Sequence, residues 1–427
     1  MKLVQEHIIK SNHQDYKSLM NLCHLSKNLY NAGLYNIRQH FFNSKNDEDH
    51  KYLNYHSNWK KMCKENNVDF RALDSHISQD VLKQVDRNFK SFFVLLKKKK
   101  EGKYKEGVNI PRYLPKDGYN LLTVSQFSKK RLENEGCLSI PKTGINIYLG
   151  EQVKSLKVNQ FRVIPLNGYV KIEVIYDFME KPLKEDNNRY ISIDLGINNL
   201  CSVSSNVVSP FIINGRPVKS INQFYNKELS HRKSRLEKIN TKKTSNFIHK
   251  LNLKRRNKIK DYFHKTSSYI VNQAVDNQVN TIIIGKNLGW KQETDMGSKN
   301  NQNFVQIPFN DLIQMIDYKA HMQGICVIMQ EESYTSKASF LDDDKIPVYK
   351  KKDQSENTET IENQEDKYVF SGRRIKRGLY KSSNGRLMNA DINGSLNIMR
   401  KYTKASPDEL LFQGVEGLVF NPRVVQL

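Results

Sequence analysis

The chain has 427 residues, enough for two or three domains, and its 69 Lys and Arg against 45 Asp and Glu give a net charge of +24. Such an excess of positive charge attracts polyanions, and the most abundant polyanion inside a cell is nucleic acid. The alternatives are a basic surface that serves only solubility and a ribosome-associated protein. No apolar run approaches the ~20 residues of a membrane span, and the N-terminus has no secretory segment, which predicts a soluble cytoplasmic protein with no membrane partner.

The N-terminal part predicts one strand and then helices. Residues 2–9 alternate weakly, as a strand does, and helical spacing begins at Ser18. A second helix is predicted after Asp74-Ser75, where Asp74 is a plausible N-cap. This helix ends in four basic residues that cannot be buried and that we expect either to contact phosphate or to remain a solvated helix end: Lys97, Lys98, Lys99 and Lys100.

Residues 104–180 change character, because short apolar runs are separated by Gly, Pro and Asn turns. This pattern predicts a small β-barrel or sheet. Residues 182–188 form a polar linker to the next domain.

The stretch 190–402 predicts a different order of elements. A strand at 190–194 and its hairpin partner at 200–204 come first, and long basic helices follow. Then come an apolar strand at 281–284, a helix at 311–323 closed by Gly324, a strand at 325–330 and a final helix after Asp391. This order predicts a mixed α/β sheet of RNase H type.

Two segments stand apart by charge. Residues 231–260 hold twelve Lys and Arg and one acid, which predicts a long basic helical rod that lies along a nucleic-acid backbone or is simply solvated. The candidate contacts there are Lys254, Arg255 and Arg256. Residues 353–366 hold six acids and no aromatic residue, which predicts a disordered loop without chemistry.

Two aspartates could take part in phosphodiester cleavage. Two Mg²⁺ ions ~4 Å apart stabilise the attacking and leaving oxygens, and such ions require carboxylate ligands. Asp194 ends an apolar strand before a glycine turn, and Asp391 opens a helix among small residues. Taken alone, Asp194 could equally cap a turn, and Asp391 could simply complement the helix dipole.

The combination resembles a known family. The segment 193–200 is similar to the first RuvC motif of TnpB proteins and the related type V CRISPR effectors, and 389–398 is similar to the third. Between them, 334–337 resembles the Tyr-Thr-Ser segment that normally introduces a zinc ribbon, and 306–308 and 318–320 also match. The likeness covers 190–402, with weaker echoes at 72–96 and 414–425.

The chain departs from the family at the middle catalytic glutamate. This residue normally follows the strand corresponding to 281–284, where the chain has Gly285-Lys286-Asn287 and no carboxylate. Glu293 comes too late, whereas Glu331 and Glu332 end the next strand, and neighbouring parallel strands end at one edge of a sheet. We favour a relocated glutamate at 331 or 332, without deciding which; the alternative is a site that lost its middle acid and only binds.

The zinc-ribbon cysteines are also missing. Residues 336–339 and 377–380 stand where the two pairs belong, and neither contains cysteine. The five cysteines are scattered and form no C-x-x-C pair, so we expect no disulfides and no zinc site, only small core side chains. They are Cys23, Cys63, Cys137, Cys201 and Cys326.

The resemblance implies a multidomain α+β protein. A β-barrel (wedge) domain at 1–10 and 101–185 and a helical recognition domain at 11–100 would hold a guide RNA and read a short motif beside the double-stranded target DNA. A RuvC nuclease domain at 186–402 would cut that DNA, and a tail would follow at 403–427. Two Mg²⁺ would be held by Asp194, Glu331 or Glu332, and Asp391.

Four basic residues near the third motif could guide the DNA strand or form a plain basic loop: Arg373, Arg374, Lys376 and Arg377.

Two other functions compete with guided cleavage. One is a nuclease-inactive RNA-guided DNA-binding repressor, and the other is an RNA-binding accessory factor of transposition.

Overall fold

The computed structural model describes residues 1–43, 52–239, 244–287, 302, 304–347, 368–410 and 419–427. The acidic segment 353–366 and Glu293 lie outside these residues. The chain divides into two compact units, Met1–Met179 and Glu180–Leu427, each described by itself. The finer division into four parts stays a prediction. No helix among the described residues is long and apolar enough to cross a membrane.

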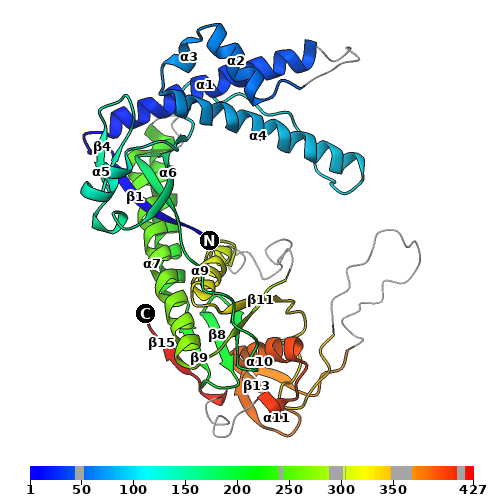
Figure 1. Ribbon diagram of the computed structural model, residues 1–427. Helices are drawn as coiled ribbons and strands as arrows, with labels where there is room; N and C mark the ends of the chain where they lie inside the picture. The colour runs from blue at the N-terminus through cyan, green and yellow to red at the C-terminus, as the bar shows by residue number, and fades with distance from the viewer. Residues whose placement is uncertain (44–51, 240–243, 288–301, 303, 348–367, 411–418) are drawn as a thin grey trace. The chain divides into compact units, whose positions relative to one another are not determined.

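The first unit packs helices on an antiparallel sheet (Figure 1). Asp74 caps α4 by accepting a hydrogen bond from the His76 amide, and the apolar side chains spaced by four residues, Ile77, Val81 and Val85, are buried. The elements in chain order are β1 (Lys2–Lys10), α1 (Tyr16–Asn43), α2 (Tyr55–Lys64), α3 (Val68–Arg71), α4 (Ser75–Lys100), β2 (Leu122–Val124), α5 (Lys129–Glu135), β3 (Cys137–Ser139), β4 (Asn146–Tyr148), a 3₁₀ turn (Glu151–Val153), β5 (Lys157–Leu166) and β6 (Tyr169–Asp177).

The predicted closed β-barrel is not found in the described part of this unit. Four strands form a sheet in the order β1-β6-β5-β2, and β3 pairs only with β4 in a separate hairpin. The edge strands β1 and β2 therefore do not meet, and four strands are too few to close around a core of side chains. Residues of α1 and α4 share one buried core with this sheet, so helices supply the cover that further strands would supply in a barrel.

The second unit is built on a six-stranded mixed sheet in the order β11-β10-β7-β8-β9-β15. The predicted hairpin is confirmed, since β7 pairs antiparallel with β8, and β10 runs parallel to both β7 and β11. The elements are β7 (Tyr190–Leu195), β8 (Asn199–Ser205), β9 (Phe211–Asn214), α6 (Arg216–Ile239), α7 (Asn246–Asp276), β10 (Thr281–Gly285), α9 (Phe309–Met322), β11 (Cys326–Gln330), β12 (Arg373–Lys376), β13 (Leu379–Lys381), β14 (Leu387–Asn389), α10 (Ala390–Thr403), α11 (Pro407–Leu410) and β15 (Arg423–Val425).

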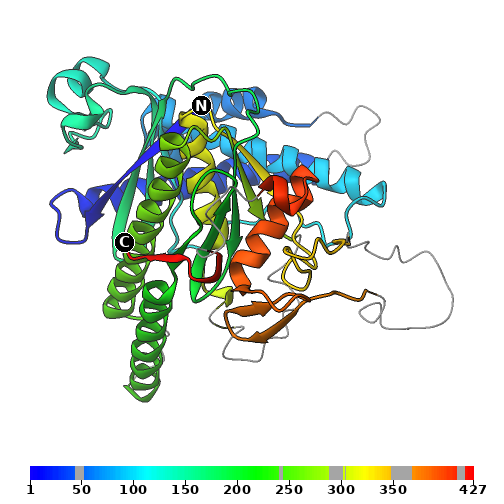
Figure 2. The same cartoon turned by 90° about the horizontal axis from the view of Figure 1, so that it is seen from below.

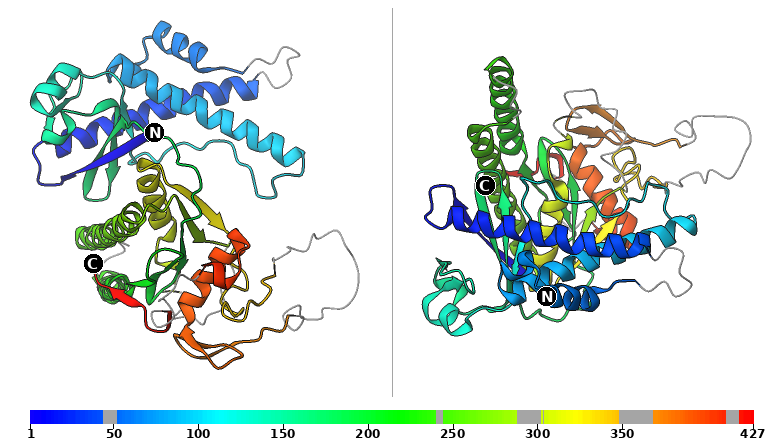
Figure 3. Two further views of the ribbon diagram at one scale, coloured as in Figure 1. Left: turned by 60° about the horizontal axis from the view of Figure 1, so that its bottom comes forward. Right: turned by 90° about the horizontal axis from the view of Figure 1, so that it is seen from above.

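Helices cover both faces of this sheet, as is usual for parallel strands such as those at its centre. Side chains of α7 and α9 pack with Ile191 and Ile193 of β7 in one core. On the other face, α10 packs with Tyr190 and Ile283. Figure 3 shows α7 and α10 on opposite sides of the strands. Because side chains alternate along a strand, the even-numbered residues of β7 face α10.

The predicted single basic rod over 231–260 is wrong. The segment contains the end of α6 and the start of α7, and Asn222 on α6 meets Arg255 on α7 while Arg232 meets Phe247 (Figure 2). These pairs run in opposite directions along the chain, so the helices are antiparallel neighbours. Helical spacing alone does not reveal a chain reversal between two equally basic halves.

Candidate active site

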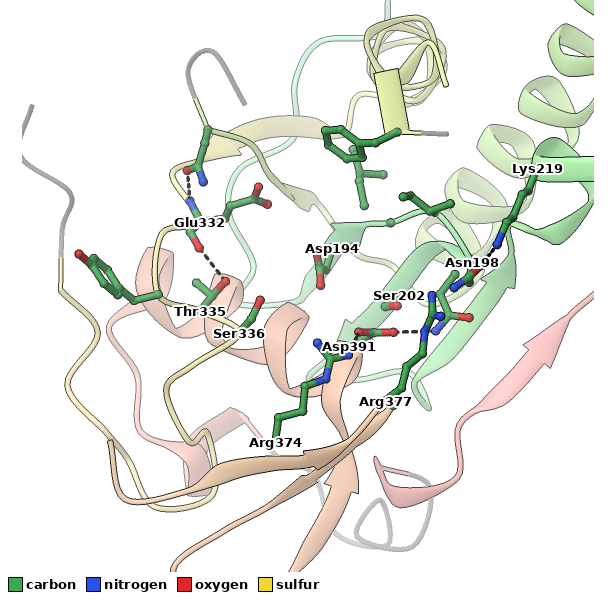
Figure 4. A pocket seen from close by; sticks show the side chains of 18 of the residues that line it. Asp194, Asn198, Ser202, Lys219, Glu332, Thr335, Ser336, Arg374, Arg377 and Asp391 are labelled. Carbon is green, nitrogen blue, oxygen red and sulfur yellow. Dashed lines mark hydrogen bonds and ion pairs between the residues drawn. The ribbon is translucent and has the colours of Figure 1, made fainter. Parts of the chain in front are cut away.

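An open cleft of about 1290 Å³ lies in the second unit beside the ends of β7 and β10 (Figure 4). Its lining combines three acidic side chains with basic ones. The acidic residues are Asp194, Glu332 and Asp391, and the basic residues are Arg216, Lys219, Arg374, Lys376 and Arg377. Three of the four predicted acids therefore reach one cleft.

Asp194 is carried by β7 on the face that α10 covers. Ser192, two residues earlier, donates a hydrogen bond of 2.7 Å to the Ser395 carbonyl of that helix. A Cβ atom placed on Gly394 would lie only 2.9 Å from Oδ2 of Asp194. The small residues of the third motif therefore let the helix backbone approach the aspartate closely, as the sequence indicated.

Asp391 lies in the first turn of α10. Asn389 caps this helix by accepting hydrogen bonds from the amides of Asp391 (3.0 Å) and Ile392 (3.2 Å). The two carboxylate oxygens of Asp391 accept from different groups: Oδ1 from Arg374 at 3.0 Å and Oδ2 from Asn199 at 2.7 Å. This carboxylate is thus fully oriented by its neighbours.

The two consecutive glutamates differ sharply in their partners. Glu331 accepts hydrogen bonds from Lys401, whose side chain is 7% exposed, and from the amide of Ser333. Glu332 instead lines the cleft, and its Oε2 is buried without a hydrogen-bond partner among the described residues. Only Glu332 therefore has a carboxylate available to a ligand of the cleft.

The backbone of Glu332 is held from both sides. Its amide donates to Oδ1 of Asn287 at 3.0 Å, and its carbonyl accepts from Oγ1 of Thr335 at 2.8 Å. A Cβ atom on Gly285 would come within 2.6 Å of Oε2 of Glu332. The glycine in the position where the family carries its glutamate thus leaves the space that the carboxylate of Glu332 fills.

Burial and neighbouring carboxylates raise the pKa of two acidic side chains of the cleft. Burial raises the pKa of Asp194 well above its usual range, the carboxylates of Glu332 and Asp391 add to the shift, and Arg374 opposes it. Burial, helped by the charge of Glu331, raises the pKa of Glu332 to about 7, and Lys401 opposes this shift. For both side chains, burial and neighbouring negative charges therefore outweigh the nearby positive charges of Arg374 and Lys401.

The chemistry of these residues fits a hard divalent cation. All three side chains offer oxygen ligands, and one carboxylate oxygen, Oε2 of Glu332, is buried without a partner among the described residues. Within the described ranges, however, no group of three or more His, Cys, Asp and Glu side chains has an arrangement that could hold a metal ion as it stands. In this conformation the carboxylate of Asp391 is engaged by Arg374 and Asn199.

The predicted basic residues fall into different places. The cleft is lined by Arg374, Lys376 and Arg377 but not by Arg373. In the first unit, the exposed last turn of α4 consists of Lys97 to Lys100. Lys254 and Arg256 are exposed on α7.

Arg255 faces inward, because its guanidinium donates to Oδ1 of Asn222 at 2.7 Å and to the Gln306 carbonyl at 2.9 Å.

Sequence reasoning missed two basic residues of the cleft, Arg216 and Lys219. Their only signal in the sequence is their position directly after the third strand, β9.

A network of serine and aspartate occupies the segments where the family carries its zinc ribbon. Asp342 accepts hydrogen bonds from Ser339, from Ser371 at 3.0 Å, and from the amide and hydroxyl of Ser383 at 2.9 and 2.7 Å. Asp344 accepts from the amide of Ser339 at 2.7 Å and the hydroxyl of Ser371 at 2.6 Å. Hydrogen bonds therefore join the two halves of this loop.

Two family models match the chain in sequence order. The family described as "Probable transposase" (OrfB_IS605) matches residues 170–291, and "Cas12f1-like, TNB domain" matches residues 309–398. A curated relative, the TnpB-like protein ORF457 of Acidianus two-tailed virus, is 22% identical over 90% of this chain and 83% of its own length. These matches support the resemblance to the TnpB family that the sequence motifs indicated.

Solved structures of similar proteins cover most of this chain. A Cas12f1–sgRNA–target DNA complex covers 94% of this chain and 100% of its own, at 15% identity and a TM-score of 0.33. A CRISPR-Cas12f ternary complex covers 90% and 80%, at 16% identity and a TM-score of 0.33. The Cas12f1-like match at 309–398 contains both Glu332 and Asp391, and the transposase match contains Asp194.

Proposed function

We propose that the chain is an RNA-guided DNA endonuclease that hydrolyses phosphodiester bonds with Mg²⁺ held by Asp194, Glu332 and Asp391. The observation that carries the proposal is the meeting of these acids, from three distant stretches of sequence, in one cleft, where burial and the other two carboxylates raise the pKa of Asp194. Such a cluster is costly unless a cation completes it, which makes it a candidate for function.

The topology of the second unit supports an RNase H-like (RuvC) assignment. Three antiparallel strands, β7 to β9, are followed by β10 and β11, which run parallel to β7. This agrees with the sheet type that the sequence pattern and the family resemblance imply. Asp194 on the central strand and Glu332 after the edge strand then reach one end of the sheet.

The side chains divide the chemical work. Magnesium ions at the site would activate a water molecule and stabilise the attacking and leaving oxygens of the phosphodiester. Asp194, Glu332 and Asp391 hold the ions, and Glu331 positions Glu332 by anchoring its neighbouring backbone to Lys401 on α10.

The basic residues of the cleft orient the DNA strand. Arg377 and Lys376 stand on or beside β12 at one wall, and Lys219 on α6 lies at another. Their positive charges would bind phosphates of the DNA strand and so hold that strand over the three acidic side chains.

The partners we propose are a guide RNA and double-stranded target DNA. The net charge of +24 suits both polyanions, and the similar Cas12f1 structure is a complex with sgRNA and target DNA. Base pairing of the guide would select the target, and the first unit, with Lys97 to Lys100, would hold the guide and read a short adjacent motif.

The test begins with purification of the protein with its bound RNA and sequencing of that RNA. The complex is then incubated with Mg²⁺ and a DNA library that carries the target. Glu332→Gln should abolish cleavage, whereas Glu331→Gln should retain part of it, because its carboxylate acts only through position. Normal cleavage by Glu332→Gln would overturn this site assignment.

A nuclease-inactive RNA-guided DNA binder is the second candidate. It is favoured by the engagement of Asp391 with Arg374 and by the lack of a ready-made metal-holding group within the described ranges. Guide-dependent DNA binding without Mg²⁺-dependent cleavage would establish it. DNA binding that is identical with and without the RNA would instead indicate a transposition accessory factor.

A further inference from the structure

Among the described residues, Arg374 is the ion-pair partner of the three acids of the cleft. Its Nη2 lies 3.0 Å from Oδ1 of Asp391, and Figure 4 shows its side chain pointing from β12 towards Asp391. The side chain is 45% exposed and stands on β12, at the edge of a three-stranded ribbon. Arg374 can therefore leave Asp391 without disturbing a packed core.

A divalent cation would require the same carboxylate. Oδ2 of Asp391 is already held by Asn199 at 2.7 Å, so Oδ1, the oxygen paired with Arg374, is the one that can be released at a low cost. An exposed ion pair contributes little to stability, so a cation that carries two charges can displace it. A guanidinium this close to the site also repels such a cation.

We propose that Arg374 is the resident counter-ion of the cleft: it keeps Asp391 beside the other acids and competes with the divalent cation for that carboxylate. The inference rests on the proposed metal site. It makes Arg374 a positioning residue whose charge sets the cation affinity. Arg377 lines the same cleft but forms no ion pair with a carboxylate of the described residues.

The test measures Mn²⁺ binding to the full-length protein by electron paramagnetic resonance of the free ion. We expect Arg374→Gln to bind Mn²⁺ about fivefold more tightly than the unmodified protein, the factor that corresponds to ~1 kcal/mol for an exposed pair. Arg374→Lys, which keeps the charge, should stay near the unmodified affinity, and Arg377→Gln is the matched control with less than a twofold change. Arg374→Met repeats the test should the glutamine variant unfold.

The outcomes separate this inference from the proposed function. If Asp194→Asn abolishes Mn²⁺ binding but Arg374→Gln binds equally or more weakly, the counter-ion role is wrong and the metal site stands. If the unmodified protein binds no Mn²⁺, or Asp194→Asn binds it equally well, both fail. An equal gain in Arg377→Gln would assign the effect to general charge and would also overturn the role of Arg374.

Discussion

The second unit contains two groups of acidic side chains whose environments are opposite. At the cleft, Asp194 and Glu332 are partly buried beside each other, and Oε2 of Glu332 has no hydrogen-bond partner within the described residues. In the loop at 339–344, Asp342 and Asp344 accept hydrogen bonds from serine hydroxyls and backbone amides. Burial raises the pKa of Glu332 to about 7, whereas in Asp342 the hydrogen bonds outweigh burial and lower the pKa.

Under the proposed function, this is the difference between acidic side chains that bind a ligand and acidic side chains that stabilise the fold. A carboxylate that accepts all its hydrogen bonds from the protein stabilises the structure and has no free lone pair with which to bind an ion. A carboxylate left without partners costs free energy until a cation arrives. The predictions below test this comparison from the largest expected effect to the smallest.

Replacing Asp194 with Asn should lower the cleavage rate by about 10³-fold or more, because a ligand oxygen and its charge are lost. The unfolding temperature should stay the same or rise, because repulsion between carboxylates is relieved. Cleavage of a guide-matched DNA and thermal unfolding of the same preparation measure both. A large fall in the unfolding temperature would contradict the comparison.

Gly285→Ala should impair cleavage about 10²-fold while the acids themselves remain. The added methyl group would lie 2.5 Å from Cδ1 of Ile398 and 2.6 Å from Oε2 of Glu332, so the glutamate must move, at a cost of about 1–3 kcal/mol. Gly107→Ala is the control, because nothing lies within 4 Å of its Cβ. Unchanged cleavage by Gly285→Ala would show that the position of Glu332 does not matter.

Asp342→Ala should destabilise the protein by about 1–3 kcal/mol, because three serines lose their acceptor. Cleavage at low temperature should persist, since the residue touches no acid of the cleft. Urea unfolding measures the loss, and Lys345→Ala, an exposed neighbour, is the control. Lost cleavage in a folded Asp342→Ala protein would mean that the two acidic groups are coupled.

The smallest effect concerns pH. The pKa of Asp342 in the folded protein is lowered, so the unfolded state binds more protons at acidic pH. Its contribution to stability is complete above the pKa of a free aspartate, about 3.9, and is lost as the pH falls through the lower folded value. Asp342→Asn should therefore show a shallower loss of stability below pH ~4 than the unmodified protein in unfolding series at several pH values.

Local sequence signals located two of the three acids, since Asp194 and Asp391 each stand where a strand ends or a helix begins. The choice between Glu331 and Glu332 needed tertiary information, because it depends on Lys401, which lies 70 residues further along the chain. The sequence showed that Gly285 stands where the family has an acidic residue. It did not show that the absence of a side chain at Gly285 leaves room for the carboxylate of Glu332.

The errors arose in the same way. Strand closure depends on pairing between distant strands, so the apolar runs at 104–180 could not distinguish a barrel from an open sheet. Helical spacing continues through both halves of 231–260, so the reversal between α6 and α7 was invisible, as was the inward turn of Arg255 towards Asn222.

The most direct measurement is an anomalous-scattering map from crystals of the protein soaked in MnCl₂. The account predicts manganese peaks bounded by the carboxylates of Asp194, Glu332 and Asp391, with Arg374 withdrawn from Asp391. Peaks that avoid these side chains, or none in the cleft while Glu332 keeps the same conformation, would contradict it.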